Sequence, residues 1–293
     1  MKKVVVSAVQ MKMSENIDEN IEKAANYVEG AAKNGANVIL LPELFESLYF
    51  CQEKNYDFYE LAHTPEEDKG IAVMKKLAKE LDVVIPVSFY EKCGNTYFNS
   101  VAMIDAGGEM LGIYRKTHIP DDHFYQEKFY FSPGDTGFKV WNTKFAKIGV
   151  GICWDQWFPE TARCMTLMGA DILFYPTAIG SEPILEVDSK PHWQRCMQGH
   201  SAANIIPVVA ANRVGTEEVK PSEDNNYQKS SLNFYGSTFM TDETGEVIKE
   251  MDRVSEGILT NEYDLEAAKK MRTEWGVFRD RCPQHYKKIL ELR

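Results

Sequence analysis

The chain has 293 residues, of which 44% are hydrophobic and 26% charged, a composition ordinary for a folded globular protein. Its formal net charge of −11 argues against nucleic acid or an anionic membrane as the main partner. The longest apolar runs are far too short to span a bilayer, and the first residues lack the longer apolar region of a signal peptide.

The first half of the chain alternates β-type and helical patterns. Apolar residues recur at helical spacing in 16–33, and Asn34-Gly35 then ends the helix. The segment 44–64 is aromatic-rich and irregular, which predicts a functional loop. The elements expected are strands at 3–9 and 37–41, helices at 16–33 and 69–81, and strands at 83–89, 97–104 and 109–114.

The second half repeats this order without an obvious sequence repeat. Two matching halves with interleaved helices predict an α/β fold, a four-layer αββα sandwich of two mixed sheets packed face to face. No linker separates the halves, so we expect one domain over 1–293, with a C-terminal tail, 263–293, at a subunit interface. The polar stretch 215–231 is expected to be an exposed loop. The elements expected are strands at 146–152, 171–175, 206–211, 235–241, 246–250 and 255–262, and helices at 159–168, 191–204 and 264–272.

The cysteines bear on the compartment and on metal binding. They are scattered singly, without a CxxC pair, and neither a zinc-type spacing nor an HExxH motif is present. In the absence of a secretory signal we expect free thiols in a reducing, cytoplasmic compartment. We expect no metal and no cofactor. The six are Cys51, Cys93, Cys153, Cys164, Cys196 and Cys282.

One of these thiols, Cys153, lies where a strand is expected to end. The preceding strand alternates apolar residues with Gly149 and Gly151, which predicts a close approach to that backbone. A helix is expected to open at Pro159, so the thiol sits at a strand-to-helix turn, where α/β sheets bind ligands. The alternative is that Cys153 is a small buried apolar residue.

Two ionisable residues occupy comparable positions in the first half. Glu43 directly follows the buried strand 37–41, and Lys116 follows the strand 109–114. A carboxylate can take a proton from a thiol, and an ammonium can lower the thiol pKa or stabilise an oxyanion. The alternatives are a surface glutamate at a strand end and a solvated Arg115-Lys116 pair.

The segments LLPELF, YRKTHIPD and GVGICWDQWFPE, taken together and in this order, resemble the nitrilase superfamily of carbon–nitrogen hydrolases. The resemblance covers nearly the whole chain and implies the αββα sandwich already expected from the two halves. It places the catalytic Glu-Lys-Cys triad of that superfamily on Glu43, Lys116 and Cys153. A second glutamate of many members matches Glu127, in FYQEKFYFSPGD.

Within the superfamily the chain resembles the amidases that act on N-carbamoylated diamines. The resemblance implies a small cationic ureido substrate, hydrolysed through a carbamoyl thioester on Cys153. It also supports Glu182 as the carboxylate that binds the substrate ammonium, with Asp121 and Asp122 as weaker candidates. The segment Asp122-His123-Phe124 departs from the small, glycine-containing residues expected there, which leaves the shape of one pocket wall open.

Two residues beside the triad are further candidates for substrate contacts. Trp154 can offer its backbone N–H to the oxyanion, and Tyr49 can line the pocket, although an ordinary packed loop explains Tyr49 equally well. Other activities remain open: a 3-ureidopropionate amidohydrolase, an ω-amidase, or an inactive binding protein on the same fold. The first two act on substrates with a carboxylate and need an Arg or Lys in the pocket, whereas Glu182 favours an amine. We expect a homo-oligomer.

Overall fold

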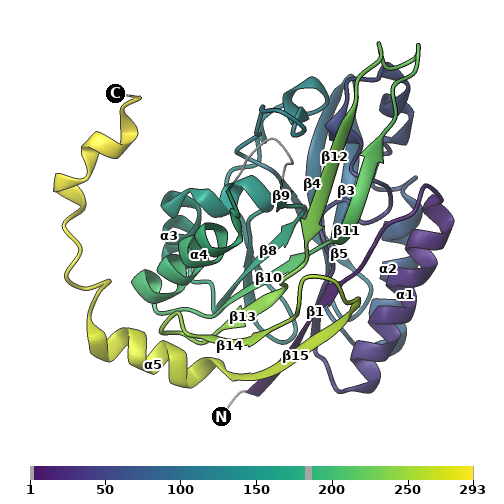
Figure 1. Ribbon diagram of the computed structural model, residues 1–293. Helices are drawn as coiled ribbons and strands as arrows, with labels where there is room; N and C mark the ends of the chain where they lie inside the picture. Colours follow the sequence, from purple (N-terminus) through teal and green to yellow (C-terminus); the bar gives the residue numbers. More distant parts are fainter. Residues whose placement is uncertain (1–2, 182–186, 293) are drawn as a thin grey trace.

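Two sheets form the centre of the molecule, and helices cover their outer faces (Figure 1). The computed structural model describes residues 3–181 and 187–292. The sheet of the second half has the strand order β14-β13-β10-β8-β7-β6, and its strands β10, β8 and β7 run parallel. These strands are β6 (Val140–Asn142), β7 (Lys147–Val150), β8 (Ile172–Thr177), β10 (Val208–Asn212), β13 (Phe239–Thr241) and β14 (Val247–Glu250).

The sheet of the first half consists of two parts, β15-β1-β2 and β3-β4-β5. Backbone hydrogen bonds from Ile39 N–H to Val84 O and from Val84 N–H to Asn37 O join the two parts. β15 comes from the end of the chain and pairs antiparallel with β1, so it ties the two halves together. The strands are β1 (Lys3–Gln10), β2 (Val38–Leu40), β3 (Ile85–Cys93), β4 (Thr96–Ile104), β5 (Met110–Arg115) and β15 (Gly257–Asp264).

The molecule has four layers, a helix layer, two sheets and a second helix layer, and buried apolar side chains fill the three spaces between them. Between the sheets, Val6 and Leu40 belong to the same cluster as Ile148 and Phe174. A second cluster lies under α1 and α2, and a third under α3 and α4. The predicted αββα sandwich is therefore confirmed. The helices are α1 (Ile17–Lys33), α2 (Lys69–Leu81), α3 (Pro159–Leu167), α4 (Lys190–Asn204) and α5 (Leu265–Trp275).

A separate small sheet corrects one prediction. The stretch 215–231 was expected to be an exposed loop. Residues 220–229 form no strand and are mostly exposed, but β11 (Val214–Val219) and β12 (Ser230–Tyr235) pair antiparallel on either side of them, and β9 (Gly180–Ser181) joins β12. The polar outward residues of this protruding hairpin hide its alternation, in which Leu232 and Phe234 are buried. β6 was also not predicted, since it has only three residues.

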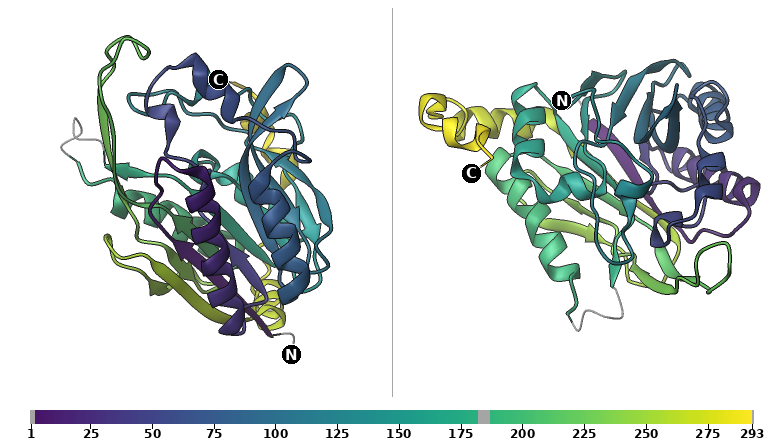
Figure 2. Two further views of the ribbon diagram at one scale, coloured as in Figure 1. Left: turned by 90° about the vertical axis from the view of Figure 1, so that its right-hand side faces the viewer. Right: turned by 90° about the horizontal axis from the view of Figure 1, so that it is seen from above.

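The tail after α5 runs along the outside of the α3–α4 layer (Figures 1 and 2). The guanidinium of Arg163, on α3, lies 4.9 Å from the ring centre of Phe278. This cation–π pair is one contact between the tail and the helices that cover the second sheet. Several large apolar side chains of the tail are exposed, and Leu290 keeps 85% of its surface accessible. No helix in the described part of the chain is long and apolar enough to cross a membrane.

Candidate active site

The thiol of Cys153 sits on a sharp turn just after β7. Its φ of 40° lies in the left-handed region, which is costly for a residue with a side chain and is typical of functional turns. The 3-10 turn Cys153–Trp157 follows, and α3 begins with Pro159. The predicted strand, thiol and helix are therefore found in that order.

The two glycines before Cys153 serve packing and not ligand approach. A Cβ atom at Gly149 would lie 2.9 Å from side-chain atoms of Leu173 and Met165. At Gly151 it would lie 2.9 Å from the ring of Tyr175. The predicted close approach to this backbone is confirmed, and what approaches it is the protein's own core.

The buried carboxylate of Asp155 holds the turn that carries the thiol. Its Oδ2 accepts hydrogen bonds from Ile152 N–H at 2.9 Å and from the Tyr114 hydroxyl at 2.7 Å. Its Oδ1 accepts from His118 N–H at 3.1 Å and lies 2.7 Å from His118 Nδ1. The His118 ring stacks on Phe158 with a centroid distance of 3.6 Å. Asp155 therefore ties the backbone just before Cys153 to the segment that carries Tyr114 and His118.

A fully buried ion cluster lies beside the thiol. Lys116 Nζ donates to Glu43 Oε1 at 2.9 Å and to Glu127 Oε2 at 2.6 Å, and none of the three side chains is exposed. The charges of Glu43 and Lys116 both act on the Cys153 thiol, whose Sγ lies 3.8 Å from Ala178 O. The structure thus brings together the three residues that the sequence places in the triad, together with Glu127.

The two carboxylates of this cluster differ in how their oxygens are used. Glu127 accepts from the Tyr49 hydroxyl at 2.7 Å and from Lys116, so both of its oxygens are occupied. On Glu43, Oε1 accepts from Lys116 and from Asn99 Nδ2 at 2.7 Å. Its buried Oε2 has no hydrogen-bond partner among the described residues. This oxygen is the acceptor available for a proton from the thiol or from water.

Burial dominates the proton affinities of the cluster. It raises the pKa of Cys153 well above its usual range, and Glu43 adds to this while Lys116 opposes it, so the resting side chain is a thiol. Burial disfavours the charged form of Lys116, but the carboxylates of Glu127 and Glu43 outweigh it and raise the pKa of Lys116. Burial also raises the pKa of Glu127, against the effect of Lys116. An uncharged thiol needs a base at the moment of attack.

Arg213 holds the backbone of Glu43 in place and was not predicted from the sequence. Its guanidinium donates to the carbonyl oxygens of Glu43 and Leu44, each at 2.9 Å, and to Glu217 Oε1 at 2.9 Å. Arg213 directly follows β10, as Glu43 follows β2, and this strand-end position is the signal that could have found it.

The remaining candidates lie at different distances from the cluster. Tyr49 is buried within it, whereas Trp154 follows Cys153 with a partly exposed ring near Trp157. Asp121 is exposed and lines an outer cavity with Asp122 and His123. Asp122-His123-Phe124 belongs to a tight turn, closed by hydrogen bonds between the backbones of Asp122 and Tyr125, with Phe124 at φ 67°.

Glu182 lies outside the described residues. The described part of the chain holds no cluster of three or more His, Cys, Asp or Glu side chains suited to a metal ion. The groups that the structure brings together are a thiol, an ammonium and two carboxylates, a set that can carry out acyl transfer through a covalent thioester.

Comparison with known proteins agrees with this chemistry. The sequence profile of the carbon-nitrogen hydrolase family matches residues 5–273. The chain belongs to the carbon–nitrogen hydrolases, the nitrilase superfamily.

Individual relatives are similar to this chain over nearly its whole length. The chain is 54% identical to the N-carbamoylputrescine amidase of Arabidopsis thaliana, over 99% of this chain and 96% of that protein. It is 51% identical to the citrullinase of Francisella tularensis, over 99% of each chain. The crystal structure of a carbon-nitrogen hydrolase from Helicobacter pylori G27 superposes with a TM-score of 0.90 at 37% identity, covering 99% of both chains.

Proposed function

We propose that the protein hydrolyses N-carbamoylputrescine to putrescine, CO₂ and ammonia. The observation that carries the proposal is the buried cluster of Glu43, Lys116 and Glu127 beside the Cys153 thiol. The similarity to N-carbamoylputrescine amidases over the full chain supports this substrate.

The reaction follows from the groups at the site. Cys153 Sγ attacks the ureido carbon while Glu43 Oε2 takes the thiol proton, and Lys116 stabilises the negative charge on the ureido oxygen. Collapse of the tetrahedral adduct breaks the bond to the terminal nitrogen, which takes the proton from Glu43 and leaves as ammonia. Glu43 then activates water, which cleaves the thioester and restores the thiol. The released carbamate loses CO₂ and leaves the diamine.

The ureido substrates of the two similar enzymes differ in one group. Citrulline carries the same ureidopropyl chain as N-carbamoylputrescine, with an added carboxylate beside its amine. A buried carboxylate needs a cationic partner. Among the described residues the fully buried Lys and Arg side chains are Lys116 and Arg213, and both are already paired. This favours the substrate without the carboxylate.

A direct comparison of the two substrates tests the assignment. Ammonia release is measured with N-carbamoylputrescine and with citrulline at matched concentrations. We expect kcat/KM for N-carbamoylputrescine to be higher by about two orders of magnitude or more, because an unpaired buried charge costs several kcal/mol. An equal or higher value for citrulline would make the protein a citrullinase.

For the substrate ammonium we propose Glu182, from its residue type and its place directly after β9. The loss of one partner from a buried charge pair costs about 2–5 kcal/mol. Glu182→Gln is therefore expected to lower kcat/KM for N-carbamoylputrescine strongly. A neutral N-carbamoyl alkylamine of the same length serves as the matched control and should be hardly affected. If both substrates lose activity equally, Glu182 is not the ammonium partner.

We further propose that the protein is a cytoplasmic homo-oligomer. All six cysteines are free, as expected in a reducing compartment. The exposed apolar side chains of the tail support the proposal that a second copy covers it. Combined replacement of Ile289, Leu290 and Leu292 by Ser is expected to lower the mass measured by light scattering. An unchanged mass would place the interface elsewhere.

A further inference from the structure

A second cavity, of about 430 Å³, lies between the loop after Glu43, the start of α1 and the β11–β12 hairpin. Its volume falls in the range of small-molecule sites. Cys153, Glu43 and Lys116 are not among its described lining residues, so it is separate from the catalytic cluster. Tyr49 belongs to both, since it lines the cavity and its hydroxyl donates to Glu127.

The described lining of this cavity is strongly acidic. It contains five carboxylates and one lysine, Lys220. Only Glu217 among the five is neutralised by a buried cation, since Arg213 NH1 lies 2.9 Å from its Oε1. The field inside the cavity therefore favours a cation. The carboxylates are Glu15, Glu53, Glu217, Glu218 and Asp224.

Glu53 supplies the observation that points to a ligand. Its side chain lines the cavity and only 8% of the residue's surface is exposed. The buried Oε2 has no hydrogen-bond partner among the described residues. Burial raises the pKa of this carboxyl, and a hydrogen bond with the Asn225 side chain opposes the rise only in part. An ammonium donor from a ligand would satisfy this oxygen.

The remaining wall suits an alkyl chain. Phe50 and Phe58 line the cavity beside Glu53, and Phe50 is buried. Such rings cover methylene groups and attract a nearby ammonium through their faces. Glu218 and Asp224 are exposed lining residues and can hold a second ammonium nearer to solvent.

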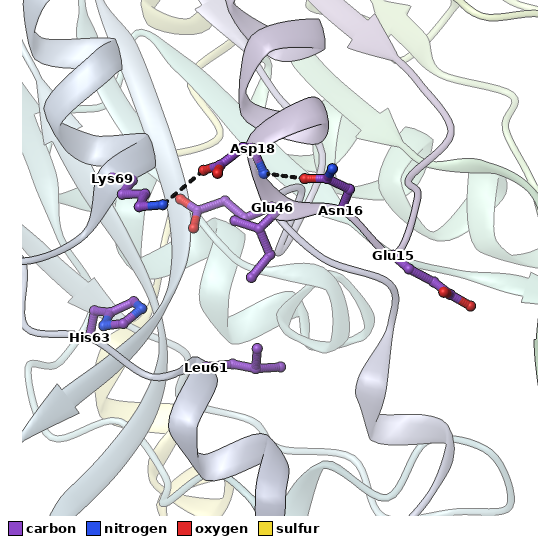
Figure 3. A pocket seen from close by; sticks show the side chains of 8 residues that line it. Glu15, Asn16, Asp18, Glu46, Leu61, His63 and Lys69 are labelled. Carbon is purple, nitrogen blue, oxygen red and sulfur yellow. Dashed lines mark hydrogen bonds and ion pairs between the residues drawn. The ribbon is translucent and has the colours of Figure 1, made fainter.

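A neighbouring cavity of about 560 Å³, which shares Glu15, Ile17 and Leu61 with this one, is different. There the ammonium of Lys69 already lies 2.9 Å from Asp18 Oδ1 (Figure 3). The protein's own lysine thus neutralises part of that lining, although the buried Oε1 of Glu46 there also lacks a hydrogen-bond partner among the described residues. At Glu53 no lysine in the described part of the chain reaches Oε2.

We propose that the cavity at Glu53 binds a short alkyl diamine, with one ammonium on Glu53 and the other among the carboxylates of the rim. The cavity shares Tyr49 with the catalytic cluster, but its charges and its open volume do not depend on which substrate the enzyme hydrolyses. Under the proposed function its ligand belongs to the same chemical class as the reaction product, and the protein has two diamine sites.

The test is calorimetric titration of the full-length protein with 1,4-diaminobutane. Glu53→Gln keeps the size of the side chain and removes its charge. It should weaken the affinity of this site for the diamine roughly 10-fold or more. Asp224→Asn, at the rim, should weaken it a few-fold. Glu22→Gln, on the exposed face of α1, removes the same charge elsewhere and serves as the control, with no change expected. 1,4-Butanediol, which has the same chain without charge, should not bind.

The stoichiometry separates this proposal from the proposed function. Two sites, one lost in Glu53→Gln and the other in Glu182→Gln, support both. One site that depends on Glu53 supports the cavity alone and counts against the putrescine product. If diamine binding is unaffected in both Glu53→Gln and Asp224→Asn, or if 1,4-butanediol binds equally well, the cavity is not a diamine site.

Discussion

Replacing Asp155 by Asn tests whether the catalytic turn is held in place by a buried carboxylate. The substitution keeps the shape of the side chain and removes one acceptor oxygen. In the wild type the two oxygens accept from the backbone N–H groups of Ile152 and His118 on opposite sides. Whichever way the Asn amide is turned, its NH₂ group faces one of these N–H donors and leaves it unsatisfied.

The expected cost follows from these contacts. A buried donor without a partner costs about 1–3 kcal/mol, and loss of the charge from the remaining hydrogen bonds brings the total to about 2–4 kcal/mol. Because Cys153 is held at φ 40°, part of this loss should appear as a displaced thiol. We therefore expect kcat to fall at least tenfold while KM changes little.

Urea unfolding gives the free energy of unfolding, and initial rates of ammonia release give kcat and KM. Asp57→Asn, at an exposed position on the surface, provides a matched control and should change neither. The rate at which iodoacetamide alkylates Cys153 reports the position of the thiol directly. If Asp155→Asn unfolds within about 0.5 kcal/mol of the wild type, as an ordinary surface substitution does, the carboxylate does not hold the turn.

Further predictions concern the chemistry and the pH dependence. Cys153→Ser should abolish turnover and keep the fold, and near-normal activity would refute the thioester. Glu43→Gln and Lys116→Ala should each lower kcat by about 10³-fold or more, since groups acting as one unit are non-additive, and activity should survive exhaustive chelation. Burial raises the pKa of Cys51, so the folded chain keeps this proton above pH 9 while the unfolded chain loses it, and stability falls as pH rises. Cys51→Ala should reduce this slope by about 1.4 kcal/mol per pH unit above pH 9, whereas the exposed Cys93→Ala should leave it unchanged.

The fold could be predicted from the sequence because its signals are local. Apolar spacing identified α1 and α2, and the continuous apolar run 37–41 identified the buried strand β2. The repeated order of strands and helices then predicted the two sheets. The hairpin of β11 and β12 was missed because its outward residues are polar on both strands, so its alternation rests on few buried positions.

The supports of the site could not be predicted in this way. Asp155 acts through Tyr114 and His118, which come from β5 and the loop that follows it, about 40 positions earlier in the sequence. Arg213 reaches the carbonyl of Glu43 across 170 positions. Contacts of this kind depend on how the two sheets face each other, which the periodicity of each strand does not specify.

The hydrogen bonds of the two glutamates suit the different tasks that the proposed reaction requires of them. Glu127 accepts from Tyr49 on one oxygen and from Lys116 on the other, which is the arrangement of an ionised carboxylate that positions the ammonium. A proton arriving on Glu127 would have to displace one of these donors. Glu43 shares the same ammonium through Oε1 only and keeps Oε2 open. A proton can therefore enter and leave on Glu43 while Lys116 stays in place, which the attack by the thiol and the later attack by water both require.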